Sequence, residues 1–125
     1  MDKKHLILII DDDKYLQKAY TAKLLHDGYD VLAAGTGTEG MRRIRESSPD
    51  LVLLDLVMPE MSGIEVLKNV QDDPELKEKT KIIVLSNSVR ESDKELMLKY
   101  GAIDYFIKST TPITTVVEVI KKHLA

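Results

Sequence analysis

The amino-acid sequence predicts a doubly wound α/β fold of the flavodoxin-like type, (βα)5, with a five-stranded parallel sheet in the order 2-1-3-4-5. Two observations support it. Short runs rich in Ile, Val and Leu alternate along the whole chain with stretches of helical periodicity, as in successive βαβ units. Three of these runs are apolar throughout and two are mixed, which predicts three central strands and two edge strands. Right-handed crossovers leave few other topologies.

Five apolar runs are the expected strands. The runs that precede Asp11, Asp55 and Ser86 are apolar throughout, as expected for strands buried on both faces. The other two runs contain other residue types and are expected at the edges. In chain order the five strands cover residues 6–10, 31–34, 51–54, 82–85 and 105–107.

Five helices are expected between and after these strands, each with an apolar face. The first should end at Gly28, the second before Pro49 and the fourth at Gly101, and Gly63 should open the third. The inward residues are expected to be Leu16, Ala19, Tyr20 and Leu24, then Met41 and Ile44, then Val66, Leu67 and Val70, then Leu96, Met97 and Tyr100, and last Ile113, Val116, Val117, Ile120 and Leu124.

Two connections carry specific expectations. The polar stretch 72–81 should be a long surface connection with room for an extra helical turn. Before the last helix, Thr111 is expected as the N-cap, with Pro112 in the first turn. The peptide bond between Lys108 and Ser109 is expected to be trans, because a non-proline cis bond costs about 2.5–4 kcal/mol.

Length and composition bound the class of protein. A chain of 125 residues fits one domain, expected over residues 1–125. The absence of cysteine excludes disulfides, thiolate zinc sites and cysteine nucleophiles. A net charge of −3 argues against direct nucleic-acid binding, which needs a basic face. No apolar run reaches the length of a membrane span, so no membrane contact and a cytoplasmic location are expected.

Polar side chains gather where the expected strands end. Ligands of open α/β sheets bind beyond the carboxyl ends of the strands, at the point where the strand order reverses. For Asp13, the expected role is to cap the following helix. Asp55 caps nothing nearby, since an apolar segment and Pro59 follow it. The residues expected at this rim are Asp11, Asp12, Asp13, Asp55, Ser86 and Lys108.

The chemistry of this rim suits a metal ion and a phosphate. Clustered carboxylates repel one another unless a cation lies between them, and Mg²⁺ takes oxygen ligands from one or two carboxylates. Lys108 offers phosphate a point charge, and Ser86 offers it a hydrogen bond. The combination is far more specific than any single member.

These residues occur in stretches that resemble the response regulator receiver family of two-component signalling, in particular single-domain receivers like the chemotaxis regulators. The resemblance covers essentially the whole chain. The matching stretches are ILIIDD at 7–12, DLVLLD at 50–55, MPEMSG at 58–63, IVLS at 83–86 and GAIDYFIK at 101–108.

The resemblance implies that Asp55 receives a phosphoryl group from a sensor histidine kinase or a histidine phosphotransfer protein. It also implies a Mg²⁺ cofactor, held by the carboxylates of Asp12 and Asp55 and the backbone carbonyl of Val57. Asp11 would act through a water molecule. The chain would catalyse its own phosphorylation and dephosphorylation, and would not be an enzyme that releases a small-molecule product.

The resemblance further implies a switch. Lys108 would pair with the phosphate, Ser86 would move to meet it, and Tyr105 would follow inward. The face that changes would comprise the fourth helix, fifth strand and fifth helix, from about Arg90 to Lys122. A downstream protein effector or a second copy of the chain is expected to dock there.

Three positions depart from the commonest family pattern. Asn87 stands where a small residue is usual, Val57 offers no polar side chain beside the phosphate, and Ser109 replaces a proline. No reacting group is lost. Val57 and Asn87 are expected to modulate the rates, Asn87 by crowding the approach to Asp55.

Two alternatives fit the sequence less well. A haloacid dehalogenase-like phosphatase also uses a strand-end aspartate and Mg²⁺, but it needs a second aspartate two positions on, where Val57 stands. A flavodoxin-like flavin module would need a phosphate-cradling loop after the first strand, where three aspartates would repel the phosphate.

Overall fold

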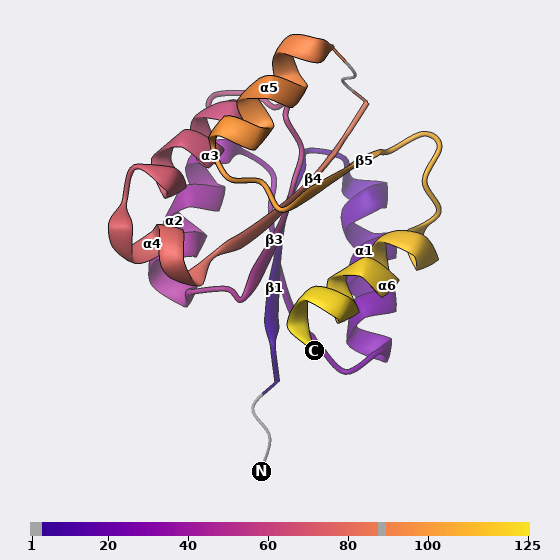
Figure 1. Cartoon of the computed structure of the whole chain (residues 1–125). Coiled ribbons are helices and arrows are strands. Elements are labelled where there is room, and N and C mark those ends of the chain that lie inside the picture. Colours follow the sequence, from indigo (N-terminus) through magenta and orange to yellow (C-terminus); the bar gives the residue numbers. More distant parts are fainter. Residues whose placement is uncertain (1–3, 88–89) are drawn as a thin grey trace.

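The structure is a computed structural model that describes residues 4–87 and 90–125 (Figure 1). Its strands form one parallel sheet in the order β2-β1-β3-β4-β5, as predicted, with β2 and β5 at the edges. The elements are β1 (Leu6–Ile10), α1 (Lys14–His26), β2 (Asp30–Ala34), α2 (Gly37–Ser47), β3 (Leu51–Leu54), α3 (Gly63–Gln71), α4 (Pro74–Lys79), β4 (Lys81–Ser86), α5 (Glu91–Lys99), β5 (Asp104–Ile107) and α6 (Ile113–Leu124).

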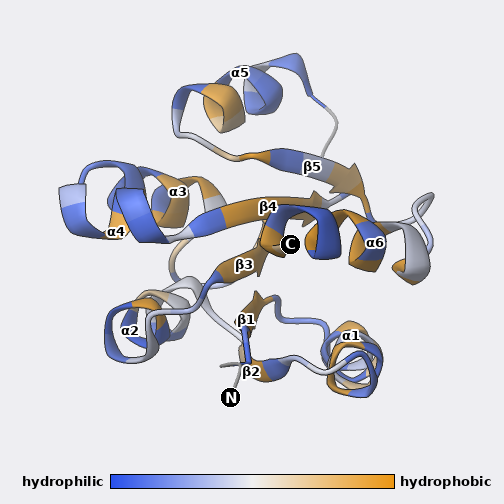
Figure 2. Cartoon of the chain, turned by 60° about the horizontal axis from the view of Figure 1, so that its bottom comes forward, coloured by the Kyte–Doolittle hydropathy of each residue, from blue (hydrophilic) through white to orange (hydrophobic). Residues whose placement is uncertain are grey.

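Helices cover both faces of the sheet. Helices α1 and α6 lie on one face, and α2 to α5 lie on the other (Figures 1 and 2). Side chains of the central strands alternate between the two cores: Ile7 and Ile9 of β1 pack with α1 and α6, whereas Leu8 and Ile10 pack toward α2 and α3. This two-sided burial explains why β1, β3 and residues 82–85 of β4 are apolar throughout.

The helix ends follow the predicted signals in most cases. Asp13 caps α1, because its Oδ1 accepts hydrogen bonds from the N–H groups of Tyr15 and Leu16. Gly28 and Gly101 follow α1 and α5 with φ of 95° and 79°, in the left-handed region that glycine adopts without strain.

Two expectations at helices are wrong. Pro112, and not Thr111, is the N-cap of α6, and no side chain caps this helix. Pro112 has an extended backbone with ψ of 148°, so the helix begins one residue later than expected. In α1, Ala19 is exposed and Gln17 is buried in its place, because Gln17 shares the helical face of Tyr20 and Leu24.

One short helix, α4, forms within the polar stretch 72–81. Asp73 caps it, Pro74 follows at its first position, and Leu76 is its buried residue. The fourth and fifth helices of the sequence prediction are therefore α5 and α6. The described peptide bonds include no cis bond, so the bond between Lys108 and Ser109 is trans, as predicted. Within residues 4–87 and 90–125, every helix is too short or too polar to cross a bilayer.

Candidate functional site

Three aspartates meet where the sheet order reverses. Asp11 and Asp12 directly follow β1, and Asp55 directly follows β3, its neighbour in the sheet. The backbone N–H of Asp55 donates to the carbonyl of Ile10 at 2.9 Å, which holds the two strand ends together. One carboxylate oxygen from each aspartate lies within 4.8 Å of the others. The predicted cluster is therefore present.

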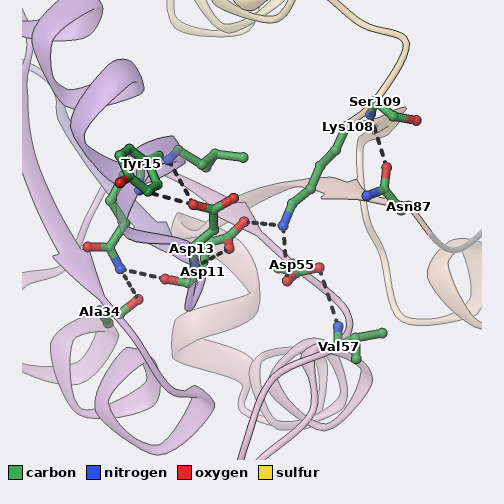
Figure 3. A network of polar contacts seen from close by, with 11 residues as sticks. Asp11, Asp13, Tyr15, Ala34, Asp55, Val57, Asn87, Lys108 and Ser109 are labelled. Atoms are coloured by element: carbon green, nitrogen blue, oxygen red, sulfur yellow. Dashed lines mark hydrogen bonds and ion pairs between the residues drawn. The ribbon is translucent and has the colours of Figure 1, made fainter.

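Lys108 bridges two of these carboxylates. Its Nζ lies 2.7 Å from Oδ2 of Asp11 and 3.2 Å from Oδ2 of Asp55 (Figure 3). The N–H of Lys108 donates to the carbonyl of Ser86 at 3.2 Å, which fixes the backbone of β5 beside the end of β4. Both carboxylates are buried, with Asp11 2% and Asp55 5% exposed. The ion pair is thus shielded from water.

Burial and charge alter the acidity of this cluster. Burial raises the pKa of Asp11, and the nearby charge of Asp55 adds to this, against the hydrogen bonds from Lys108 and from the N–H of Asp13. For Lys108, burial acts to lower the pKa, but the hydrogen bond and charge of Asp11 and the charge of Asp55 outweigh it, so the pKa is raised. Burial, together with the charge of Asp11, raises the pKa of Tyr20 to about 12.

The donor set fits a divalent cation. All three side chains offer carboxylate oxygens, which are the ligands that Mg²⁺ prefers. Lys108 offsets one of the three negative charges, and a divalent ion would offset the other two. Asp12 is exposed, so an ion can reach the cluster from solvent.

The other predicted residues lie on β4 and β5 and in the segments that follow β3 and β4. Ser86 ends β4 and is 3% exposed. Val57 is 70% exposed, and its N–H donates to Oδ1 of Asp55 at 3.4 Å. Tyr105 lies farther out on β5: it is 38% exposed, and the Nζ of Lys94 lies 6.0 Å from its ring centroid. Asn87 contacts Ser109, where its Oδ1 accepts the backbone N–H at 3.0 Å.

Two supporting residues escaped the sequence prediction. The buried side-chain amide of Gln17 donates to the carbonyl of Asp11 and, at 3.4 Å, to that of Ala34, which joins the ends of β1 and β2. A glutamine on the apolar face of α1 was the signal, since a buried amide needs partners. Gly63 packs against the backbone at Asp55, where a Cβ would lie 2.2 Å from the Asp55 carbonyl oxygen.

The sequence of the chain matches the model of one protein family, described as the response regulator receiver domain, over residues 7–120. The chain belongs to this family. It is thus a receiver domain of the two-component type, for which a phosphoacceptor role is typical and in which acidic residues bind Mg²⁺.

Curated relatives of this receiver domain include a DNA-binding response regulator and a transcriptional regulatory protein. The chain is 38% identical over 106 residues to the DNA-binding response regulator MtrA of Mycobacterium tuberculosis H37Rv, which covers 85% of the chain and 45% of the relative. It is 36% identical over 112 residues to the regulatory protein PhoP of Bacillus subtilis, and this match covers 90% of the chain and 45% of PhoP. The receiver domain therefore spans about half the length of these relatives.

Solved structures of receiver domains share the fold. A CheY-like receiver domain protein from Methanospirillum hungatei has a TM-score of 0.90 and 29% identity, with 98% of this chain and 94% of that chain covered. A response regulator from Chloroflexus aurantiacus has a TM-score of 0.87 and 30% identity, with 98% of each chain covered.

Proposed function

We propose that Asp55 is the residue that accepts the phosphoryl group. The observation that carries this proposal is the position of its carboxylate, buried at the end of β3, 3.2 Å from the ammonium of Lys108 and beside Asp11 and Asp12. A carboxylate held in place beside a cation can act as a nucleophile without a separate base, because it is already deprotonated. The donor is a phosphohistidine of a sensor histidine kinase or a histidine phosphotransfer protein.

The metal ligands of the proposal come from two segments, one after β1 and one after β3. Asp12 and Asp55 would hold Mg²⁺ through their carboxylates, Val57 through its backbone carbonyl, and Asp11 through a water molecule. When bound, Mg²⁺ supplies positive charge to the carboxylates and to the oxygens of the transferred group. The contacts of Asp11 support an indirect role, because both of its oxygens have closer partners than those of Asp55. The Nζ of Lys108 lies 2.7 Å from its Oδ2, and its Oδ1 accepts the N–H of Asp13 at 2.9 Å, against 3.2 Å and 3.4 Å at Asp55.

Transfer forms one bond and breaks one. A carboxylate oxygen of Asp55 attacks the phosphorus, and the bond between phosphorus and the donor nitrogen breaks, with its electron pair returning to the imidazole. Lys108 would then shift from the carboxylates to the phosphoryl oxygens, and the Ser86 hydroxyl would donate to another of them. Hydrolysis by an in-line water would reverse the modification. Hydrolysis would restore the Asp55 carboxylate and release inorganic phosphate. The chain would thus catalyse its own phosphorylation and dephosphorylation, without turnover of a separate small-molecule substrate.

The proposed output is a change on the face formed by α5, β5 and α6, from about Arg90 to Lys122. Movement of Ser86 toward the phosphate would open space for the Tyr105 ring, which is partly exposed and amphipathic. Leu98 and Ile103, 78% and 39% exposed, give this face an apolar character around a cavity of about 310 Å³. A protein effector or a second copy of the chain would dock there.

Two residues would tune the rates. Val57 is mostly exposed at the rim and has no polar group to orient a water molecule, so the phosphoaspartate should be long-lived. Asn87 stands next to Ser86 and should restrict the approach of donors. We further propose that the domain comprises residues 1–125, that it is cytoplasmic, and that it binds neither nucleic acid nor membranes directly.

Labelling with a small acyl phosphate tests the assignment. Wild-type protein should gain one phosphoryl group in the presence of Mg²⁺, and Asp55→Asn should gain none. Asp13→Asn is the matched control, because it removes one charge at the same rim, from a side chain that caps α1, and leaves the backbone N–H that donates to Asp11 in place. Stoichiometric labelling of the Asp55→Asn variant would contradict the proposal.

A further inference from the structure

A hydrogen bond outside the acidic cluster links the ends of β4 and β5. The side-chain oxygen Oδ1 of Asn87 accepts the N–H of Ser109 at 3.0 Å (Figure 3). One residue earlier on each strand, the N–H of Lys108 donates to the carbonyl of Ser86 at 3.2 Å. Regular pairing of the two strands ends with Ser86 opposite Ile107. The Asn87 amide therefore extends the β4–β5 ladder with a side chain in place of backbone.

This bond fixes the backbone from which Lys108 reaches the cluster. The backbone N–H groups of residues 108 and 109 both point to β4, and the N–H of Thr111 returns to the carbonyl of Ile107 at 3.1 Å. A lysine side chain has several rotatable bonds, so its ammonium is held at one place only if its backbone is also held. Without the Asn87 oxygen, the turn after Lys108 would lose its contact with β4.

We propose that Asn87 is a positioning residue, whose side-chain oxygen holds Ser109 so that Lys108 stays on the reacting carboxylate. The inference rests on the function proposed above. The bond requires a residue other than proline at position 109, because proline has no N–H. Two of the three departures from the family pattern, Asn87 and Ser109, are thus the two ends of one hydrogen bond.

Positioning and crowding by Asn87 predict opposite effects of its removal. Loss of bulk speeds the entry of a small donor, whereas loss of the oxygen slows transfer by releasing Lys108. Asn87→Leu separates the two effects, since leucine has nearly the same size and no acceptor. Asn87→Ala removes both features, so it alone would be ambiguous.

The test measures phosphoprotein formation from acetyl phosphate and Mg²⁺ over a range of donor concentrations. Asn87→Leu should lower the maximal rate by about two- to tenfold, the range of one net hydrogen bond, with little change in the donor concentration at half-saturation. In a Lys108→Met background the same substitution should have no further effect, because Asn87 acts through Lys108. Thr110→Ala, an exposed neighbour in the same turn, should keep the wild-type rate.

Amide hydrogen exchange checks the bond itself. The N–H at position 109 should exchange slowly in the wild type and in Ser109→Ala, which keeps the donor, and faster in Asn87→Leu. Two results would overturn the inference while labelling at Asp55 stands. One is a wild-type rate of phosphoprotein formation in Asn87→Leu, and the other is an equal loss of that rate when Asn87→Leu is made in the Lys108→Met background. Absence of labelling at Asp55 in the wild type would instead overturn the proposed function, and the inference with it.

Discussion

The Nζ atom of Lys108 lies closer to Asp11 than to the proposed phosphoacceptor: 2.7 Å from Oδ2 of Asp11 against 3.2 Å from Oδ2 of Asp55. One ammonium group thus holds the ends of β1 and β3 together before any phosphate or metal arrives. In the proposed mechanism, phosphorylation draws this group away from Asp11, and a bound cation competes with it for the same carboxylates. The carboxylates of the site can therefore be neutralised either by the Lys108 ammonium or by a bound cation.

Removal of this internal charge should strengthen metal binding and weaken phosphoryl transfer. Lys108→Met should bind Mg²⁺ about tenfold more tightly, because two unit charges a few ångströms apart interact by more than about 1 kcal/mol even in water. The same variant should be labelled more slowly by acetyl phosphate, since it lacks the cation that meets the phosphoryl oxygens. Lys121→Met, which removes an equal charge from the ion pair with Asp27, is the control and should change neither value. Weaker Mg²⁺ binding in Lys108→Met would contradict this description of the site.

A second prediction concerns the contact between Gly63 and the backbone at Asp55. Gly63→Ala should destabilise the fold by about 1–3 kcal/mol, the usual cost of overpacking, because the new methyl group would overlap the Asp55 carbonyl. It should also slow labelling, since the carboxylate would shift with its backbone. Denaturant unfolding and the labelling rate measure the two effects.

Gly28→Ala is the matched control for this substitution. It should also lose stability, because Gly28 has a φ of 95°, but it has open space around it. Gly28 precedes β2 at the opposite end of the sheet, so the labelling rate should be unchanged. Equal loss of labelling in both variants would show that the rate follows stability and not the position of Asp55.

A third prediction follows from Tyr20, whose pKa is raised to about 12 by burial and by Asp11. An acid with a higher pKa in the folded state holds its proton there while the unfolded chain releases it. Stability should therefore fall as the pH rises from about 10 to about 12, by about 2–3 kcal/mol in total. Tyr20→Phe should lack this part of the decline, so the difference between the two unfolding curves isolates it. Parallel pH profiles would show that Tyr20 ionises without an effect of burial.

A fourth prediction concerns transmission to the α5-β5-α6 face. Ser86→Ala should still be labelled at Asp55 but should lose the phosphate-dependent change near Tyr105, because no hydroxyl remains to be drawn to the phosphate. Amide exchange with and without acetyl phosphate gives the readout. A response limited to α1, with none around β5, would rule out this route in the wild type.

Most of the fold and the acidic cluster could be predicted from the sequence. Strand order followed from apolar composition, because burial on both faces leaves no position for polar side chains in β1, in β3 and in residues 82–85 of β4. The convergence of Asp11, Asp12 and Asp55 followed from topology, since parallel strands end at one edge.

The extra helical turn expected within 72–81 is present as α4, which begins with Asp73 before Pro74 and buries Leu76. Features that depend on side-chain register could not be predicted in this way. The link between Asn87 and Ser109 joins residues 22 positions apart, and it depends on how far each strand extends past its last pair. Ala19 was wrongly predicted to face inward. The helical spacing around Tyr20 and Leu24 allows either Ala19 or Gln17 at the boundary of the buried face, and the structure buries Gln17.

The central claim is that Asp55 carries the phosphoryl group, and peptide mapping of the phosphorylated protein tests it most directly. Wild-type protein treated with acetyl phosphate and Mg²⁺ is digested, and the modified peptide is sequenced by mass spectrometry. We expect a single phosphoryl group, on Asp55, and no phosphoryl group when Mg²⁺ is chelated before the donor is added. A phosphoryl group on any other residue, or Mg²⁺-independent labelling of Asp55, would contradict the account.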